Sequence, residues 1–226
     1  MMEISKSQKV YNEIRNAIVN RRLSPGAQLK ENEFSEKLNI SRTPIRQAFK
    51  MLADEDLVEN IPNKGTYVVN PTLDEMIEAS EMRLFLEEKL VEQIIDNITE
   101  EEITALDILV EKELNSYEIQ DILKYLEINK EFHMILSNTC KNRFLKKAIE
   151  NIINVMHVHL IFYDKFFEVN INNSRGLKQH KLIVKNIKEK NKIKLKAVIL
   201  EHTNDTLKEI KSNRNKSEDL FEDGFF

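Results

Sequence analysis

The chain has 226 residues, of which 41% are hydrophobic, and its 34 Lys+Arg against 38 Asp+Glu give a formal net charge of −4. This length allows two modest domains, each with its own hydrophobic core. The single cysteine, Cys140, excludes an intramolecular disulfide, and the sequence shows neither an apolar signal segment nor an apolar run of membrane-spanning length. We therefore expect a cytoplasmic protein without a membrane partner.

The first predicted elements are three short helices. Apolar residues at helical spacing predict a helix over about 6–20, and a second amphipathic helix is predicted over 31–38. A tight connection at 39–40 leads to a third helix, which begins within Ser-Arg-Thr-Pro-Ile-Arg at 41–46. Ser41 or Thr43 can accept a backbone N–H bond as N-cap, and Pro44 is tolerated in a first turn. Two short helices joined in this way form a helix-turn-helix, whose second helix enters the major groove of DNA.

Two arginines and a following hairpin extend this interpretation. Arg42 and Arg46 are four residues apart, on one face of the third helix, and their guanidinium forks suit guanine edges or phosphate oxygens. Taken alone, they would more simply be two ordinary surface arginines at a solvated helix start. Two β-prone runs within 57–69 flank the turn residues at 62–65, which predicts a hairpin wing. Lys64 and the backbone of Gly65 could then approach the DNA closely.

Charge and proline mark the second half of the chain. Residues 1–70 carry 11 Lys+Arg against 9 Asp+Glu (+2), residues 71–120 carry 3 against 15 (−12), and residues 121–226 carry 20 against 14 (+6). Only the first segment needs to face DNA, so the acidic stretch should be held away from it. All four prolines lie before residue 72, and beyond it the only glycines are Gly176 and Gly224, which is typical of a strongly helical tract.

We therefore predict a mainly α protein. A winged helix-turn-helix covers 1–70, a linker 71–75, an all-α antiparallel helical bundle 76–213, and a mobile tail 214–226. In this tract, helices are predicted at about 73–97, 100–116, 119–138, 142–168, 174–190 and 192–213. The aromatic and methionine side chains of the bundle are expected in its core, namely Phe85, Met134, Phe144, Met156, Phe162 and Phe166.

Histidines are the candidate ligands of the bundle. Asn129 and His133 are four residues apart on one helix face, and His180 and His202 lie on two later helices. Neutral imidazoles from three helices could bind a divalent metal, zinc or nickel, with Asn129 as an oxygen ligand. Against this, a single histidine on a bundle helix is usually just packed or solvated. His157 and His159 are two residues apart and point to different sides, so one of them could reach the same pocket.

Arg83 is the other candidate of the bundle. If it faces the interior, its fork can bind a carboxylate while a metal binds the other end of the same molecule. The alternative is a surface ion pair with Glu87, four residues further on.

Segments of the first 70 residues resemble the winged helix of GntR-family transcription regulators. The matching segments are Tyr11-x-x-Ile-Arg15, Leu23-Ser-Pro-Gly26-x-x-Leu29, Ser41-Arg-Thr-Pro-Ile-Arg46 and Asn63-Lys-Gly65. The resemblance implies that Arg42, Thr43 and Arg46 contact bases or phosphates and that Gly65 lies at the wing tip. Ser41 and Lys64 flank these positions and complete the expected DNA-binding set. Asn32 departs from the pattern, because relatives often carry a basic DNA contact there.

Residues 74–210 resemble the FCD effector domain, the helical ligand-binding domain of the FadR-like branch of that family. The resemblance rests on Phe132-His133-x-x-Leu136, Asn142-x-x-Leu145, Arg83-x-x-Leu86-Glu87 and the pair His180 and His202. It implies a metal held by three histidines and by an aspartate, which is Asn129 here. The lost charge should weaken affinity for a hard dication. Effectors of such domains are often small organic acids, so Arg83 is expected to bind the effector.

Two classes of function follow from these features. The first is a ligand-responsive transcription regulator, a repressor that binds an inverted-repeat operator of double-stranded DNA as a homodimer. The second is a helical metal-dependent hydrolase that uses His133, His180 and His202 with a metal-bound water. The hydrolase lacks a general base, because Glu131 lies on another helix face than His133, and no His-Glu-x-x-His motif is present. It also leaves the first 70 residues unexplained.

Overall fold

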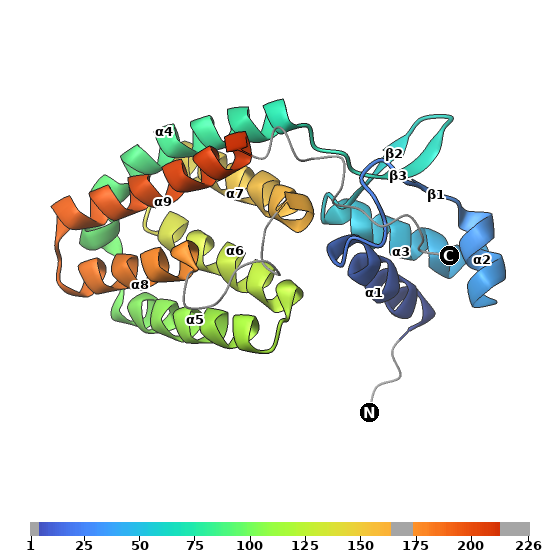
Figure 1. The fold of residues 1–226 in the computed structure, drawn as a ribbon, viewed down its shortest axis with the longest axis horizontal. Helices are drawn as coiled ribbons and strands as arrows, with labels where there is room; N and C mark the ends of the chain where they lie inside the picture. Colours follow the sequence, from blue (N-terminus) through green and yellow to red (C-terminus); the bar gives the residue numbers. More distant parts are fainter. Residues whose placement is uncertain (1–4, 164–173, 213–226) are drawn as a thin grey trace. The chain divides into compact units, whose positions relative to one another are not determined.

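The computed structural model describes residues 5–163 and 174–212. These residues form two compact units, and the boundary between them in the sequence lies between Pro71 and Thr72. The first unit contains helices α1 (Lys6–Val19), α2 (Glu31–Leu38) and α3 (Arg42–Asp54), and strands β1 (Gln28–Leu29), β2 (Val58–Ile61) and β3 (Gly65–Val68) (Figure 1). The second unit is all-helical. Among the described residues, no helix is both long and apolar enough to cross a bilayer.

A small hydrophobic core holds the first unit together. Ile14 and Ile18 of α1 are completely buried, as are Ile45 and Leu52 of α3, because the apolar stripes of the two helices face each other. Helix α2 joins this core through Phe34, whose ring meets that of Phe49 edge-on at 5.7 Å between centroids. This packing confirms the predicted three-helix arrangement and leaves the opposite side of α3 exposed.

The connection between α2 and α3 is tight because Asn39 adopts a left-handed backbone with φ of 50°. The Ser35 hydroxyl donates to the Ile40 carbonyl at 2.7 Å and so closes the turn. Ser41 is the N-cap of α3, but its side chain makes no capping hydrogen bond. The predicted capping bond from Ser41 or Thr43 is therefore wrong, although the start of the helix is correct. Pro44 lies in the first turn, as predicted.

The three strands form an antiparallel sheet in the order β1-β3-β2. The predicted hairpin is present as β2 and β3, with Asn60 opposite Thr66 and Ile61 opposite Gly65. The short strand β1 was not predicted, because two residues cannot show an alternating pattern. Gln28 pairs with Tyr67 and thereby ties the segment after α1 to the base of the wing.

Six helices make up the described part of the second unit, and each begins or ends close to its predicted boundary. They are α4 (Leu73–Asn97), α5 (Glu100–Glu118), α6 (Ile122–Asn138), α7 (Arg143–Tyr163), α8 (Arg175–Lys188) and α9 (Lys192–Ser212). Capping boxes at Thr72 with Glu75 and at Thr99 with Glu102 start α4 and α5. The last residues of the predicted fourth helix, 164–168, lie outside the described part of the chain.

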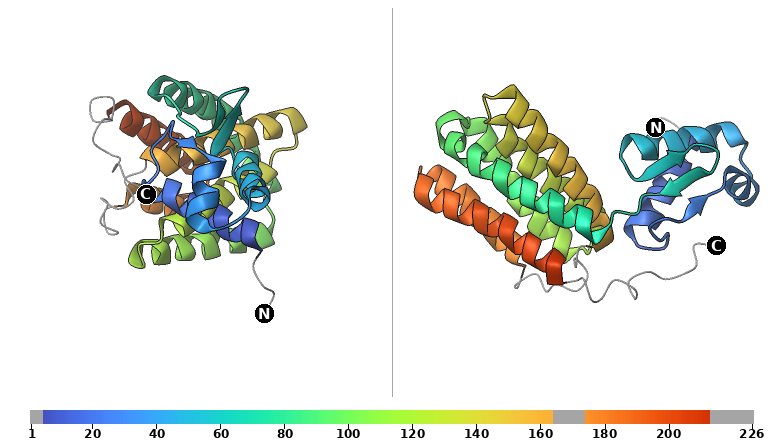
Figure 2. Two further views of the ribbon diagram at one scale, coloured as in Figure 1. Left: turned by 90° about the vertical axis from the view of Figure 1, so that its right-hand side faces the viewer. Right: turned by 90° about the horizontal axis from the view of Figure 1, so that it is seen from above.

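These helices form a closed ring. Helix α4 packs on α9, α9 on α8, α8 on α5, α5 on α6, α6 on α7, and α7 returns to α4 (Figures 1 and 2). Such an arrangement gives every helix one face toward a shared interior. Polar side chains on those inner faces can therefore meet from several helices at once.

The uneven charge of the sequence is expressed as ion pairs between helices. Lysines of α8 and α9 pair with carboxylates of the acidic helices α4 and α5, at 2.5 Å for Lys188 with Asp107 and 2.6 Å for Lys192 with Asp96. Exposed pairs of this kind are each worth about 0–1 kcal/mol. These ion pairs join the acidic helices α4 and α5 to the lysine-rich helices α8 and α9.

Two of the residues expected in the core are on the surface. Phe85 of α4 is 63% exposed and Phe144 of α7 is 71% exposed, so the core prediction is wrong for them. They lie on the outward sides of their helices, and residue type alone does not separate a core position from an exposed apolar one. Met156 and Phe162 are buried as predicted, whereas Met134 is only partly buried and Phe166 lies outside the described residues.

Candidate functional site

The exposed side of α3 carries the predicted DNA-contacting residues. Ser41, Arg42, Thr43 and Arg46 are all exposed, and the one-turn spacing of the two arginines puts them on one side of the helix. Arg46 is 65% exposed, and its Nε donates to both Glu31 carboxylate oxygens, at 2.8 and 3.0 Å. This exposed pair orients the guanidinium and can be exchanged for a phosphate or a base.

The tip of the wing has a backbone that requires glycine. Gly65 has φ of 110°, and a Cβ at this position would also lie 3.4 Å from the Gln28 side-chain nitrogen. The Lys64 carbonyl accepts from Gln28 Nε2 at 2.9 Å, while the Lys64 side chain is exposed. Gln28 therefore supports the wing, and sequence reasoning missed it because its partner lies 36 residues away.

Three buried histidines meet inside the helical ring. His133 of α6, His180 of α8 and His202 of α9 are 4%, 1% and 7% exposed. Each offers one ring nitrogen, and the three nitrogens lie within 4.8 Å of one another. The predicted cluster is thus brought together by three different helices. His157 and His159 are not part of it.

Hydrogen bonds to the outer nitrogens determine which nitrogen of His180 and His202 faces the cluster. His180 Nδ1 lies 2.7 Å from Glu113 Oε2 of α5, and a carboxylate can only accept. His202 Nδ1 lies 3.0 Å from Gln179 Oε1, and this oxygen is assigned because Gln179 Nε2 donates to an Asp205 carboxylate. Both imidazoles therefore carry a proton on Nδ1, and in its neutral form each presents a lone pair on Nε2.

The Nε2 atoms are the ones that converge. His202 Nε2 lies 3.3 Å from His133 Nε2, and His180 Nε2 is buried with no hydrogen-bond partner among the described residues. An imidazole lone pair without a donor is costly in the interior, and a divalent metal is what such a set of nitrogens binds in proteins. The donor set thus fits zinc or nickel.

Burial keeps the imidazoles of His133 and His202 neutral. The pKa of His133 is held well below its usual value, first by burial and then by the nearby Arg83 guanidinium and the other two histidines. The pKa of His202 is likewise well below its usual value, through burial and then His180 and Arg83. Neutral imidazole is the form that binds metal, so these two side chains are in the form that a metal ligand requires.

Arg83 borders the cluster from α4. Its Nη2 lies 3.0 Å from each ring nitrogen of His133, and its Nε donates to Glu87 Oε1 at 2.8 Å. Both members of this ion pair are almost completely buried, so the surface-pair alternative is wrong in its location although the predicted partner is correct. Glu87 also accepts from the Thr203 hydroxyl. The guanidinium therefore faces the interior, where it can meet a buried anion.

Asn129 is buried on α6, one turn before His133. His159, in contrast, is buried on α7, where burial lowers its pKa to about 4 and the Glu75 carboxylate opposes the shift. Glu113 and Gln179 were missed as functional residues. The signal for Glu113 was present, because it falls on the apolar stripe of α5 that carries Leu106, Leu109, Val110 and Tyr117.

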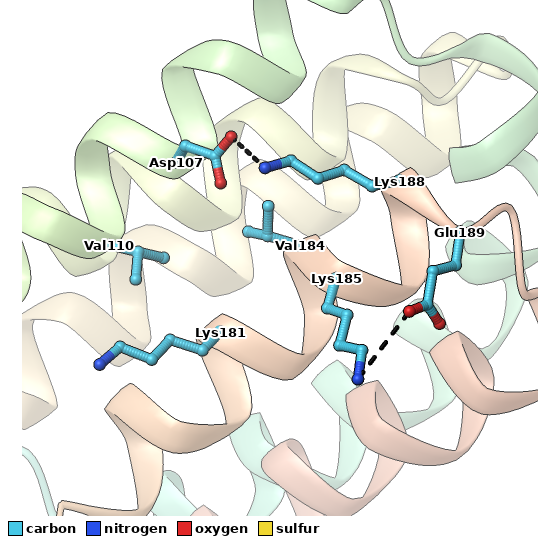
Figure 3. Close-up of a pocket in the computed structure, with 7 residues that line it drawn as sticks. All are labelled: Asp107, Val110, Lys181, Val184, Lys185, Lys188 and Glu189. Carbon is cyan, nitrogen blue, oxygen red and sulfur yellow. Dashed lines mark ion pairs between the residues drawn. The ribbon is translucent and has the colours of Figure 1, made fainter.

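A surface hollow of about 320 Å³ lies between α5 and α8, apart from the histidines. Figure 3 shows its lining, which consists of Asp107, Val110, Lys181, Val184, Lys185, Lys188 and Glu189. Asp107 pairs with Lys188, and Lys185 pairs with Glu189 at 3.8 Å. Most of its charged groups are satisfied by each other, so the interior cluster is the better candidate for a ligand.

A winged helix-turn-helix on the same chain as a helical ring with a buried polar site is the architecture of a DNA-binding regulator with a second, helical domain. Comparison with known families agrees: "Bacterial regulatory proteins, gntR family" matches residues 6–68, and "FCD domain" matches residues 78–205. The chain therefore belongs to the GntR family of transcriptional regulators, in the FadR-like branch that carries an FCD domain. Since this is a family of regulators and not of enzymes, the hydrolase alternative is dropped.

Individual relatives cover nearly the whole chain. The HTH-type transcriptional regulator YdhC of Bacillus subtilis (strain 168) is 28% identical over 202 residues, 89% of each chain. The HTH-type transcriptional repressor RspR of Escherichia coli (strain K12) is 24% identical over 215 residues, which is 95% of this chain and 93% of that one. The structure of E. coli McbR/YncC has the same fold, with a TM-score of 0.67 at 21% identity over 94% of this chain and 100% of that chain.

Proposed function

We propose that this protein is a repressor that binds an inverted-repeat operator as a homodimer and responds to a small carboxylate bound beside a divalent metal. The DNA-binding class follows from the family, and the named repressor among its relatives supports the sign of regulation. The observation that carries the sensing role is the convergence of three buried histidines next to a buried arginine. Such a cluster has no use in DNA binding itself. A protein that binds an operator would act in the cytoplasm.

DNA recognition is assigned to α3 and the wing. Arg42 and Arg46 would contact guanine edges or phosphates in the major groove, and Thr43 and Ser41 would contact the backbone at the start of the helix. At the wing, Lys64 would contact a phosphate, and the bare backbone of Gly65 would allow close approach to the duplex. The exposure of these residues supports this assignment.

Dimerisation would bring two such helices to successive half-sites, as an inverted repeat requires. The exposed apolar residues of α4 and α7 are candidates for the dimer interface, because these helices are neighbours in the ring. They include Met82 and Phe85 on α4 and Phe144 and Val155 on α7. Apolar side chains exposed on adjacent helices often mark a protein interface.

The charges of the interior favour a metal together with an anion. With neutral imidazoles, Arg83 contributes one positive charge, and Glu87 and Glu113 contribute two negative ones. A divalent cation held by His133, His180 and His202 would turn this deficit into an excess of one positive charge. A monocarboxylate bound to Arg83 would then restore neutrality, and buried charges are stable only when they are balanced. Asn129 would add a neutral oxygen ligand.

The DNA-binding assignment is tested with the Arg42→Ala/Arg46→Ala double variant. An operator is first selected with the wild-type chain from random duplexes, and affinities are then measured by fluorescence anisotropy. Each lost base contact costs about 1–3 kcal/mol, so the double variant should bind at least about 30-fold more weakly while melting like wild type. The Lys178→Ala/Lys181→Ala variant removes the same charge from exposed positions of α8 and should bind normally. Wild-type affinity in the arginine variant would reject the assignment.

A further inference from the structure

Glu113 is the unbalanced charge of the protein interior. Among the described residues that are buried, the only arginine, lysine, aspartate or glutamate side chains are Arg83, Glu87 and Glu113. Arg83 and Glu87 neutralise each other in one ion pair. Glu113 is 1% exposed. Among the described residues, its Oε2 hydrogen-bonds to His180, and its second oxygen, Oε1, has no hydrogen-bond partner. A carboxylate held in this way costs free energy unless a positive charge lies nearby.

We propose that Glu113 is the anionic positioning residue of the metal site: it fixes the orientation of His180 and supplies the negative charge that stabilises a divalent cation. This inference rests on the metal site proposed above. Glu113 does not itself join the three histidines as a ligand, because its contact is to the outer nitrogen of His180. It acts through that ring, by raising the electron density of the nitrogen that faces the cation.

The neighbouring histidine provides an internal comparison. His202 is oriented by the neutral amide of Gln179, which is itself hydrogen-bonded to Asp205. An amide therefore suffices to hold an imidazole in the required tautomer. The carboxylate at 113 does the same for His180 at greater cost, so its charge has a separate effect. The three side chains that meet at the cluster are imidazoles and none is a carboxylate, so that effect is to offset the charge of a cation.

The location of Glu113 on α5 supports the same conclusion. The other buried residues of that helix are uncharged, namely Leu106, Leu109, Val110, Ser116 and Tyr117. A leucine or methionine would continue the stripe without a desolvation penalty. The chain instead buries a carboxylate where α5 contacts His180 of the cluster.

The test is the Glu113→Gln variant, which keeps a hydrogen-bond acceptor for His180 and removes the charge. Zn²⁺ and Ni²⁺ affinities of the full chain are measured by competition with a chromophoric chelator. Loss of a group that orients a metal ligand typically weakens affinity about 10–100-fold, and we expect that range for E113Q. The matched control is Glu111→Gln, which removes the same charge from an exposed position two residues earlier and should leave both affinities unchanged.

The outcomes separate this inference from the metal site itself. E113Q with wild-type affinity would overturn the role of Glu113 and leave the site standing. If the wild-type protein binds neither Zn²⁺ nor Ni²⁺, and so behaves like the His180→Ala variant, the metal site and the role of Glu113 are both overturned. If melting shows that E113Q does not fold, imidazole ¹H–¹⁵N spectra of the zinc-loaded wild type decide the matter. A proton on His180 Nδ1 with zinc on Nε2 supports the proposal, and zinc on Nδ1 overturns it.

Discussion

Replacing Arg83 with methionine should leave the Glu87 carboxylate without its cation inside the helical ring. Arg83 Nε donates to Glu87 Oε1 at 2.8 Å, and both side chains are almost completely buried. Removal of one partner from a buried ion pair costs about 3–5 kcal/mol, because the remaining charge stays desolvated. Glu87 retains the Thr203 hydroxyl as a donor, so we expect the lower end of that range. At roughly 2–4 °C per kcal/mol for a chain of this size, the melting temperature should fall by about 6–12 °C.

Circular dichroism melts of the metal-free chain measure this effect. The Arg83→Met/Glu87→Met double variant removes both charges and should recover stability to within about 1 kcal/mol of wild type, since an apolar pair of similar volume replaces a buried ion pair at little cost. Lys89→Met makes the same kind of replacement at an exposed position of α4 and should melt like wild type. An Arg83→Met variant that also melts like wild type would refute the buried pair.

Three further predictions concern separate parts of the helical unit. Burial lowers the pKa of His159 from its usual 6.5 to about 4, so its contribution to stability is complete above pH 6.5 and is lost as the pH falls toward 4. In urea unfolding, His159→Gln should reduce the slope of stability against pH by about 1.4 kcal/mol per unit in that window, and an unchanged slope would contradict the assignment. Replacing Phe85 and Phe144 with aspartate should yield monomers in sedimentation experiments, whereas dimers of this variant would exclude α4 and α7 as the interface. Asn129→Asp should tighten zinc binding by roughly tenfold by adding a charged oxygen, and unchanged affinity would mean that this side chain points elsewhere.

The helices could be predicted from the sequence because their signals are local. Apolar spacing, turn residues and the confinement of proline to the first 71 residues determine most helix boundaries to within a few residues. The capping hydrogen bond expected at Ser41 is absent, because a side chain near a helix start need not turn back to the backbone. Strand β1 was not predicted, because a two-residue strand is defined only by its pairing with β3. The core prediction was wrong for Phe85 and Phe144, because an exposed apolar residue can show the same local sequence pattern as a core residue.

The candidate site divides in the same way. His133, His180 and His202 could be proposed from residue type and helical position, and the resemblance to the FCD domain strengthened the proposal. The groups that orient them could not be assigned, because Glu113 lies 67 residues from His180 and the two meet only when the ring closes. Arg83 and Glu87 were recognised as a pair, but their burial depends on α9, which supplies Thr203. Contacts between distant helices therefore account for what the sequence left open.

Coupling between the histidine cluster and DNA affinity is tested most directly by one titration. The dissociation constant of the full chain for its selected operator is measured without metal, with Zn²⁺, and with Zn²⁺ plus each of a panel of small carboxylates, for wild type and for His180→Ala. We predict that at least one carboxylate changes wild-type DNA affinity by about 5–150-fold, the usual range of allosteric coupling, and that His180→Ala abolishes the change. Identical wild-type affinity under every condition, or an unaltered response in His180→Ala, would contradict a sensing role for the cluster.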